Sequence, residues 1–397
     1  MGDILLSVVL PTKDRYLYLK SFVTMVESFH QPGLELVVQD NSADNGEFLP
    51  WLEDHRFEGL VYDYVPEHLS IIENSDLAVS HSHGRYLCFM GDDDLISRYL
   101  YGFAEQMDRV GCDAAVFQKA QYDWPGVKRR AHRFPSLMCP PFQGRLETVD
   151  PAEALDKLLQ RGATDLGHVP QLYHGIVRRD CLERIRQRTG TYFPGPSPDM
   201  AVAVAVCLTA RRCLYCDVPF TVAGTAPKSG GGMGANHQHK GSIQKATWLP
   251  EGTEAHWEVR NPKVWTAPTI WAESALKALR AMGAEDKLER FNYPYSYAYL
   301  WLFNPNFQKL AVEQLRHGER FRFAYAVLRL FVVRCRTFVQ NFMLAHYGIT
   351  NKKLRDHVTD SVQAEEWIDR WIDEQQIDLN AMFAAWKESS PAPVEQG

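Results

Sequence analysis

The chain has 397 residues, more than the ~100–200 residues of an average domain, so two units or one large unit are expected. Hydrophobic residues make up 45% of the chain and charged residues 23%, proportions typical of a globular protein with a substantial core. The formal net charge of −6 excludes the broad basic surface with which many proteins bind nucleic acids.

The start of the chain, MGDILLSVVL, has no basic segment ahead of a long apolar one, so no signal peptide is predicted. No run reaches the ~18 consecutive apolar residues that a membrane-spanning helix needs. The eight cysteines lack the spacing of a disulfide framework, which is typical of reduced thiols. These features predict a cytoplasmic protein, with peripheral attachment to the inner face of the membrane as a second possibility.

Short apolar runs alternate with segments of helical periodicity through the first 118 residues. This alternation predicts an α/β domain with a mainly parallel sheet flanked by helices. The expected strands are 4–10, 34–38, 61–65, 86–90 and 112–118, and the expected helices are 16–29, 70–83 and 100–110.

Polar clusters follow three of these strands: PTKDR at 11–15, QDNSADN at 39–45 and GDDD at 91–94. Ligands of parallel α/β sheets bind beyond the carboxyl ends of the strands. The three clusters are therefore expected to face one crevice.

The cluster at 91–94 contains three consecutive carboxylates, Asp92, Asp93 and Asp94. Adjacent carboxylates raise one another's pKa unless a cation shares the site. Mg²⁺ and Mn²⁺ prefer such hard oxygen ligands, so a divalent metal site is one interpretation. A solvated acidic turn that caps the following helix is the alternative.

Four motifs together give the chain a family resemblance over roughly residues 4–225. They are SVVLPTKDR, VVQDNSADN, the segment from Asn74 through GRYLCFMGDDDLI, and PSPDM. In this combination the chain resembles family 2 glycosyltransferases of the GT-A (Rossmann-like) fold. The resemblance implies an inverting, metal-dependent enzyme that transfers a sugar from a nucleotide-diphosphate donor, usually a UDP-sugar, to a hydroxyl group.

The resemblance also implies roles for individual residues. Pro11, Thr12 and Arg15 would line the nucleotide pocket, Asp40 would bind the base with support from Asn41, and Asn74 would contact the nucleotide or donor. Asp92 and Asp93 would contact the donor, and Asp92, Asp93 and Asp94 would supply the ligands of Mn²⁺ or Mg²⁺. The family more often has an acidic residue where this chain has Gly91, which leaves the primary metal ligand undecided.

Asp199 is the predicted catalytic base. It follows three prolines in FPGPSPDMAVAVAV and opens a helix of small apolar residues. An inverting transfer needs a base to take the acceptor's proton, and the family has an acidic residue at the matching place. From the local residues alone, Asp199 could equally be a first-turn acid that stabilises the helix N-terminus.

Three segments near the predicted site have open interpretations. The basic segment with Lys128, Arg129, Arg130 and Arg133 is either an anionic-acceptor contact or a solvated loop, and His168, Tyr173 and His174 are acceptor-contact candidates or structural residues. The Gly-rich segment 223–242 is predicted as a mobile loop, either a lid or a linker. As a lid it would bring Lys228, His237, His239 or Lys240 to the diphosphate.

The remainder of the chain is predicted to be helical, with segments at 272–282, 308–317, 320–345 and 362–372. Residues 321–344 are strongly apolar yet contain four arginines. They form either an interfacial helix on an anionic membrane or a helix that packs in the core or a homodimer.

The predicted organisation is a GT-A catalytic domain at 1–225, with a donor half at 1–118 and an acceptor half at 119–225. A Gly-rich linker at 226–261, a helical region at 262–388 and a disordered tail at 389–397 follow. The expected partners are a nucleotide sugar and a saccharide or lipid-linked saccharide acceptor, as in surface polysaccharide or glycoconjugate synthesis. The alternative functions are a sugar-phosphate nucleotidyltransferase and a non-catalytic sugar-binding scaffold.

Overall fold

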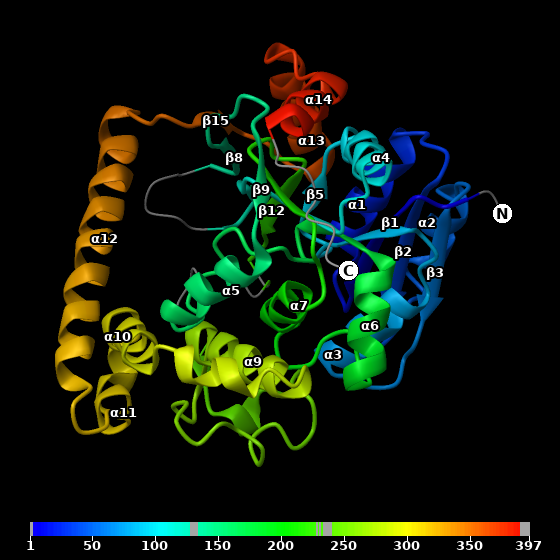
Figure 1. The fold of residues 1–397 in the computed structure, drawn as a ribbon. Helices are drawn as coiled ribbons and strands as arrows, with labels where there is room; N and C mark the ends of the chain where they lie inside the picture. The colour runs from blue at the N-terminus through cyan, green and yellow to red at the C-terminus, as the bar shows by residue number, and fades with distance from the viewer. Residues whose placement is uncertain (1–2, 128–133, 228, 230–231, 233–239, 390–397) are drawn as a thin grey trace.

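A computed structural model describes residues 3–127, 134–227, 229, 232 and 240–389. Its main sheet has eight strands in the order β3-β2-β1-β4-β10-β6-β11-β9 (Figure 1). These strands are β1 (Leu6–Thr12), β2 (Leu34–Asp40), β3 (Leu60–Tyr64), β4 (Tyr86–Phe89), β6 (Ala114–Phe117), β9 (Leu146–Val149), β10 (Gly175–Arg178) and β11 (Cys213–Cys216).

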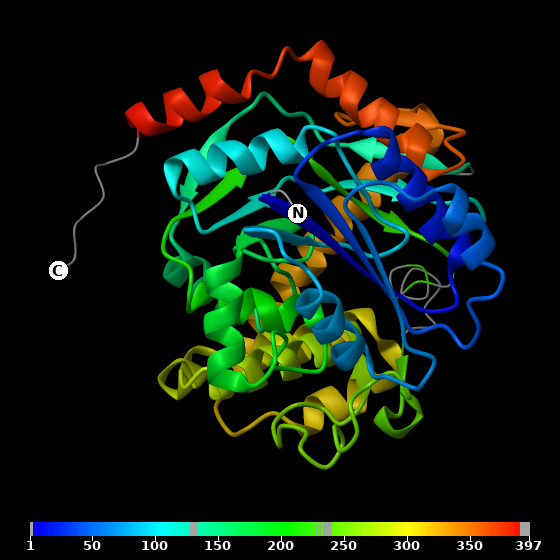
Figure 2. The same cartoon turned by 90° about the vertical axis from the view of Figure 1, so that its right-hand side faces the viewer.

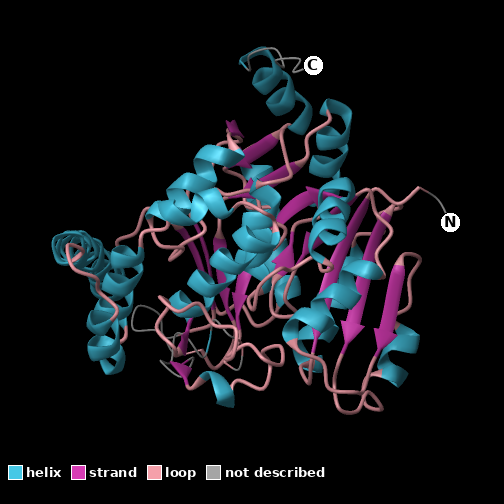
Figure 3. Cartoon of the chain, turned by 60° about the horizontal axis from the view of Figure 1, so that its bottom comes forward, coloured by secondary structure: helices cyan, strands magenta, loops and turns pink. Residues whose placement is uncertain are grey.

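The predicted parallel arrangement is confirmed for the first four strands in the chain, where β1 pairs in parallel with both β2 and β4, and β2 with β3. Strand β10 then enters antiparallel between β4 and β6, and β11 runs parallel to β6. The result is a mixed α/β sheet flanked by helices, as the GT-A prediction requires (Figure 3).

Strand β1 shows why the sheet must be covered on both faces. Leu6, Val8 and Leu10 are buried in one hydrophobic cluster, whereas Val9 is buried in another on the opposite face. Side chains alternate between the two faces of a strand, so an apolar run such as this one needs helices on both sides.

Helices α1 (Tyr16–Ser28), α2 (Leu49–Asp54), α4 (Leu100–Val110), α13 (Ser361–Glu374) and α14 (Leu379–Ser389) contribute to the first cluster. Helices α3 (Ile71–Ser80), α6 (Arg179–Thr189) and α7 (Pro198–Cys207) contribute to the second. Figure 2 shows α13 and α14, in orange and red, running over the same side of the sheet as α1 and α4.

A second sheet of five strands lies beside the first, in the order β15-β8-β7-β12-β5. Its strands come from distant parts of the chain: β5 (Leu95–Ile96), β7 (Ala120–Asp123), β8 (Ser136–Cys139), β12 (Thr221–Thr225) and β15 (Lys353–Asp356). Strands β13 (Lys240–Gly241) and β14 (Trp265–Thr266) form a separate antiparallel pair.

The segment that begins at α9 (Ala267–Ala281) is largely helical, as predicted, and α9 packs against α7. It continues with α10 (Tyr293–Phe303), α11 (Gln308–Glu313) and the 28-residue α12 (Arg320–Tyr347). Helix α12 packs on α10 along part of its length and stands at the edge of the molecule (Figure 1). No helix within the described ranges is both long enough and apolar enough to cross a membrane.

Several elements differ from the sequence predictions. Helices α10 and α14 were not predicted, and 223–225 of the predicted Gly-rich loop are the end of β12, paired with β7. Residues 128–133, with their four basic side chains, and Lys228, His237 and His239 lie outside the described residues, as does the tail from 390 onward. The predicted domain boundaries stay a prediction, since β15, α13 and α14 return to pack on the first half of the chain.

Candidate active site

The three predicted polar clusters meet at one edge of the main sheet. Thr12 at the end of β1 is in register with Asp40 at the end of β2, and the 91–94 segment follows β4 on the other side of β1. A cavity of about 990 Å³ opens at this edge. Its walls include the predicted residues Pro11, Thr12, Arg15, Asn41, Asn74, Asp92, Asp93, Asp94 and Asp199.

Arg15 supplies a positive charge to the aspartate cluster. Its Nη1 lies 2.8 Å from Asp92 Oδ1 and its Nη2 lies 3.0 Å from Asp93 Oδ1. Thr12 adds a hydrogen bond of 2.6 Å from its hydroxyl to Asp92 Oδ2. Two of the three carboxylates are thus compensated by residues that follow β1.

Asp94 is compensated by different groups. Its Oδ2 accepts hydrogen bonds from the Tyr173 hydroxyl at 3.0 Å and the Gly91 amide at 2.7 Å, and lies 3.1 Å from His174 Nε2. Its Oδ1 accepts the Gly224 amide at 2.7 Å. Burial alone would raise the pKa of Asp94, but His174 and these hydrogen bonds bring it below its ordinary value.

Asp92 and Asp93 titrate differently from Asp94. Burial raises the pKa of Asp92 to about 7, because the attraction of Arg15 offsets only part of the desolvation and Asp93 adds repulsion. Burial likewise raises the pKa of Asp93, again against the attraction of Arg15. The negative charge of these two carboxylates is therefore only partly compensated within the chain, whereas that of Asp94 is compensated.

Gly91, where the family more often has an acid, is in close contact with this network. A Cβ at this position would lie 3.0 Å from Asp94 Oδ2 and 3.2 Å from the Tyr173 hydroxyl. Any larger residue here would therefore push on the groups that hold Asp94.

Asp40, the predicted base contact, is fully buried and does not line the cavity. Its carboxylate accepts hydrogen bonds from the Tyr16 hydroxyl at 2.9 Å, the Tyr62 hydroxyl at 2.8 Å and the Ser42 amide at 2.9 Å. Burial together with Asp40 raises the pKa of both tyrosines. Because its oxygens are already engaged, Asp40 would have to exchange partners before it could bind a base, so this role stays a prediction.

Asn41 does line the cavity, and its side chain is engaged in shaping the wall. Its amide group donates to the Val65 carbonyl at 2.7 Å and the Glu67 carbonyl at 2.6 Å, while its oxygen accepts from Lys13 Nζ at 2.9 Å. These bonds tie the ends of β1, β2 and β3 together.

The side-chain oxygen of Asn74 is a buried hydrogen-bond acceptor to which no described residue donates. It sits on α3, whose first turn is fixed by a reciprocal capping box between Ser70 and Glu73. Its amide nitrogen donates to the Thr12 carbonyl at 3.3 Å, but its Oδ1 accepts no hydrogen bond from any described residue, although Asn74 is only 8% exposed. A buried polar atom without a partner at a cavity wall is suited to a ligand.

Asp199 lies at the start of α7, as predicted, and faces the same cavity. Its Oδ1 accepts the Ser197 hydroxyl and, at 2.7 Å, the amide of Met200. The Ser197 amide in turn donates to Ser274 Oγ on α9 at 2.8 Å. Asp199 is therefore both a first-turn acid of the helix and a carboxylate that lines the cavity.

Of the three acceptor-contact candidates, Tyr173 and His174 line the cavity and bind Asp94, whereas His168 stacks on Tyr215 with ring centroids 4.0 Å apart. The cavity is also lined by residues that the sequence did not suggest, namely Lys119, Trp248, Ile270, Trp271 and Lys352. A single residue far from the motifs in the sequence has no local pattern that marks it as part of the cavity.

The residues present fit a divalent cation in one respect. Asp92 Oδ1 accepts no hydrogen bond and lies 2.8 Å from the Arg15 guanidinium. This oxygen therefore already lies beside a positive group, and carboxylate oxygens are the ligands that divalent cations such as Mg²⁺ prefer. Within the described ranges, however, no three acidic, imidazole or thiol side chains converge as a ready set of metal ligands. Metal binding stays a prediction.

Comparison with known proteins agrees with three of the four motifs, all except PSPDM. Residues 7–173 match the family described as Glycosyl transferase family 2. These residues form a glycosyl transferase family 2 domain. The match includes β1 to β4, the aspartate motif, Asn74 and Tyr173, and ends before Asp199.

Two solved structures align with most of the chain. The complex of S. aureus TarS residues 1–349 with UDP-GlcNAc has 14% identity and a TM-score of 0.46, covering 93% of this chain and 92% of that one. The mannosyltransferase PcManGT from Pyrobaculum calidifontis, in complex with GDP-Man and Mn²⁺, has 16% identity and a TM-score of 0.39, covering 83% and 87%. No curated protein sequence matches the chain. Identities this low give no information about the substrates of this chain.

Proposed function

We propose that this protein is an inverting, metal-dependent glycosyltransferase that moves a sugar from a nucleotide-diphosphate donor, a UDP-sugar, to a hydroxyl acceptor. One observation carries the proposal. In a family 2 domain, a cavity of about 990 Å³ brings the aspartate cluster, Arg15, Asn74 and Asp199 together beyond the carboxyl ends of the strands. Parallel α/β sheets bind nucleotides at this edge.

The donor diphosphate would lie against Asp92 and Asp93. Asp94 has both oxygens engaged by Tyr173, His174 and backbone amides, so we assign the metal to Asp92 and Asp93 and a positioning role to Asp94. A divalent ion bound there would neutralise the charge that develops on the leaving diphosphate. Arg15 would turn from the carboxylates to the phosphates, since its guanidinium suits either partner.

Asp199 would act as the base that takes the proton of the acceptor hydroxyl. It approaches the cavity from the start of α7, whereas the aspartate cluster approaches from the end of β4. A displacement with inversion needs the acceptor and the leaving group on opposite faces of the sugar. A base that lines the same cavity as the metal-binding carboxylates but comes from a different element would suit this requirement.

The acceptor side is proposed to bind a saccharide, as in the assembly of a surface polysaccharide or glycoconjugate. Trp248 and Trp271 line the cavity together with Ile270. Apolar and aromatic walls with a few polar groups are typical of sites for small organic ligands.

The test is a panel of nucleotide sugars that includes UDP-N-acetylglucosamine and GDP-mannose, each with and without Mn²⁺. A glycosyltransferase releases nucleoside diphosphate from one donor, in a manner that depends on Mn²⁺ and on an added saccharide. Formation of pyrophosphate from sugar phosphate and nucleoside triphosphate would instead indicate a nucleotidyltransferase. Tight sugar binding without any turnover would indicate a scaffold and overturn the proposal.

A further inference from the structure

Helix α12 exposes one continuous apolar face. Its buried side chains are Ala326 and Leu330, which form a hydrophobic cluster with Ala298 of α10. The opposite side carries large apolar residues that are 44% to 84% exposed. They are Phe321, Tyr325, Leu328, Val332, Val339 and Phe342.

The spacing of these residues makes the face continuous. Steps of three, four and seven residues place side chains on one side of an α-helix. Cys335 completes the row between Val332 and Val339, and it is exposed whereas the other seven cysteines are buried. An apolar stripe of this length on the outside of a protein marks an interaction surface.

The charge beside the apolar face is entirely positive. Arg322, Arg329 and Arg336 recur every seven residues and therefore form a row along one edge of the stripe. Arg320 and Arg334 lie elsewhere on the helix, and α12 contains no aspartate or glutamate. The whole chain carries a net charge of −6, so this positive charge is local to the helix.

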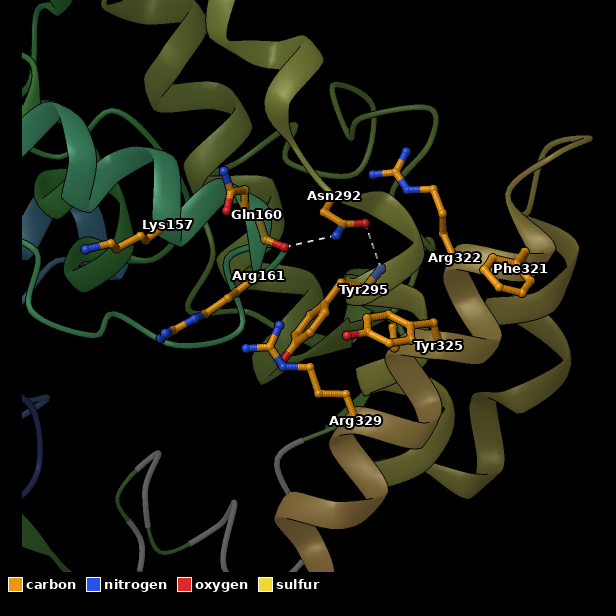
Figure 4. Close-up of a pocket in the computed structure, with 10 residues that line it drawn as sticks. Lys157, Gln160, Arg161, Asn292, Tyr295, Phe321, Arg322, Tyr325 and Arg329 are labelled. Carbon is orange, nitrogen blue, oxygen red and sulfur yellow. Dashed lines mark hydrogen bonds between the residues drawn. The ribbon is translucent and has the colours of Figure 1, made fainter.

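A hollow of about 460 Å³ adjoins the face, between α5 (Pro151–Gln160), α10 and α12. Figure 4 shows Arg161 and Arg329 beside Tyr295, with Tyr325 and Phe321 extending from the hollow to the exposed stripe. No acidic side chain lines the hollow. Arg161 pairs with Asp165 at 3.0 Å and Lys157 with Glu153 at 2.6 Å. Arg322 and Arg329 form no ion pair within the described part of the chain, so both are available to an anion.

We propose that α12 lies on the surface of an anionic lipid bilayer, with its apolar face among the acyl chains and the hollow around a lipid headgroup phosphate. An amphipathic helix with a basic edge binds such surfaces by apolar burial and electrostatic attraction together. Guanidinium groups bind phosphate well. This proposal is independent of the catalytic activity proposed above.

A second copy of this chain is the other occupant of such a face, and the charges oppose it. Helices that pair along an apolar stripe set complementary charges along its edges. Neither copy of α12 has an acidic residue that could pair with the arginine row of the other, and an antiparallel pair would bring the two rows together. An anionic bilayer fits the same edge without repulsion.

The test uses the full chain labelled at Cys335 with a polarity-sensitive fluorophore, since this cysteine alone is exposed. Vesicles of phosphatidylcholine with phosphatidylglycerol are compared with vesicles of phosphatidylcholine alone. The expected result is a blue shift of the label and flotation of the protein with the anionic vesicles only, weakened by added salt. The paired change Arg322→Glu and Arg329→Glu should lower vesicle binding roughly tenfold or more.

The paired change Leu328→Asp and Val332→Asp places charges in the apolar face and should abolish binding to the anionic vesicles. Melting curves verify that each variant is folded. Val259→Asp and Lys309→Glu are matched controls, because both side chains are 91% exposed and lie outside α12. These controls should bind vesicles as the unmodified chain does. Three outcomes would overturn the proposal. The protein could bind neutral vesicles as well as anionic ones, or it could bind neither kind. It could also form a dimer without vesicles that the paired change Leu328→Asp and Val332→Asp dissociates.

Discussion

The Arg15 guanidinium lies 2.8 Å from the Asp92 carboxylate, and this contact joins the residues that follow β1 to the segment that follows β4. The two strands are hydrogen-bonded neighbours in the sheet. A buried carboxylate is stable when a cation shares its site, and here the chain supplies that cation itself. A metal ion bound at this edge would therefore replace Arg15 as the positive group beside Asp92.

Replacing Arg15 by alanine tests this exchange. Asp92 and Asp93 are 2% and 4% exposed, so loss of their counter-charge should lower the free energy of unfolding by roughly 2–4 kcal/mol. Added Mn²⁺ should then raise the melting temperature of Arg15→Ala more than that of the unmodified chain, because no guanidinium competes. Lys13→Ala is the control, since Lys13 contacts Asn41 and no carboxylate. An unchanged melting temperature together with an unchanged response to Mn²⁺ would contradict the prediction.

Asp199→Asn tests the proposed base. The variant should lose about 10²–10⁴-fold in transfer rate while donor affinity stays the same, because only proton removal is impaired. Asp180→Asn is a matched control, since Asp180 is also a first-turn acid, on α6, and does not line the cavity. Single-turnover transfer and nucleotide titration separate the two effects. If both variants retain full transfer rates, Asp199 has only its role at the helix N-terminus.

Gly224→Ala tests the close approach of β12 to the aspartate cluster. A Cβ on Gly224 would lie 1.6 Å from the Asp93 carbonyl oxygen, and the Gly224 amide donates to Asp94. We expect a loss of about 1–3 kcal/mol in unfolding free energy, as for other overpacked sites, and weaker nucleotide binding. Denaturant unfolding measures the first and titration the second. Gly46→Ala, whose Cβ would come no nearer than 3.3 Å to another group, should leave both unchanged.

Glu365 predicts a pH dependence of stability. Burial, then the neighbouring Asp369, raises its pKa from 4.5 to about 9. Between these values the folded chain keeps a proton that the unfolded chain releases, so this residue makes stability fall as pH rises. Melting temperatures of Glu365→Gln should decline less over this interval than those of the unmodified chain. The exposed neighbour variant Glu366→Gln should follow the unmodified chain, and an equally steep decline in Glu365→Gln would count against the prediction.

The sequence was sufficient to predict the edge of the sheet where the site lies. Strands β1, β2 and β4 are short, largely apolar runs buried on both faces, and parallel pairing brings their carboxyl ends together. The contacts of Arg15 and Thr12 with Asp92 confirm that the first and third polar clusters meet. Arg15 supplies a positive charge to Asp92 and Asp93, and the predicted divalent metal at these aspartates stays a prediction.

The partners of Asp94 could not be predicted in the same way. Tyr173 is 79 residues away in the sequence and Gly224 is 130 residues away. They reach Asp94 because β10 enters the sheet antiparallel and β12 pairs with β5, and no local pattern fixes either pairing. The tyrosines that hold Asp40 were missed for a related reason: hydroxyl donors on a strand or helix look like ordinary core residues.

Strand β15 closes the second sheet by pairing with β8, more than two hundred residues earlier in the chain. During synthesis on the ribosome, β8 therefore remains an open edge until the residues from 353 onward have emerged. Unpaired edges are prone to association between nascent chains, and contacts this distant in sequence form slowly. Polypeptides that end before β15 would keep this edge unpaired, and we expect them to aggregate more readily than the full chain.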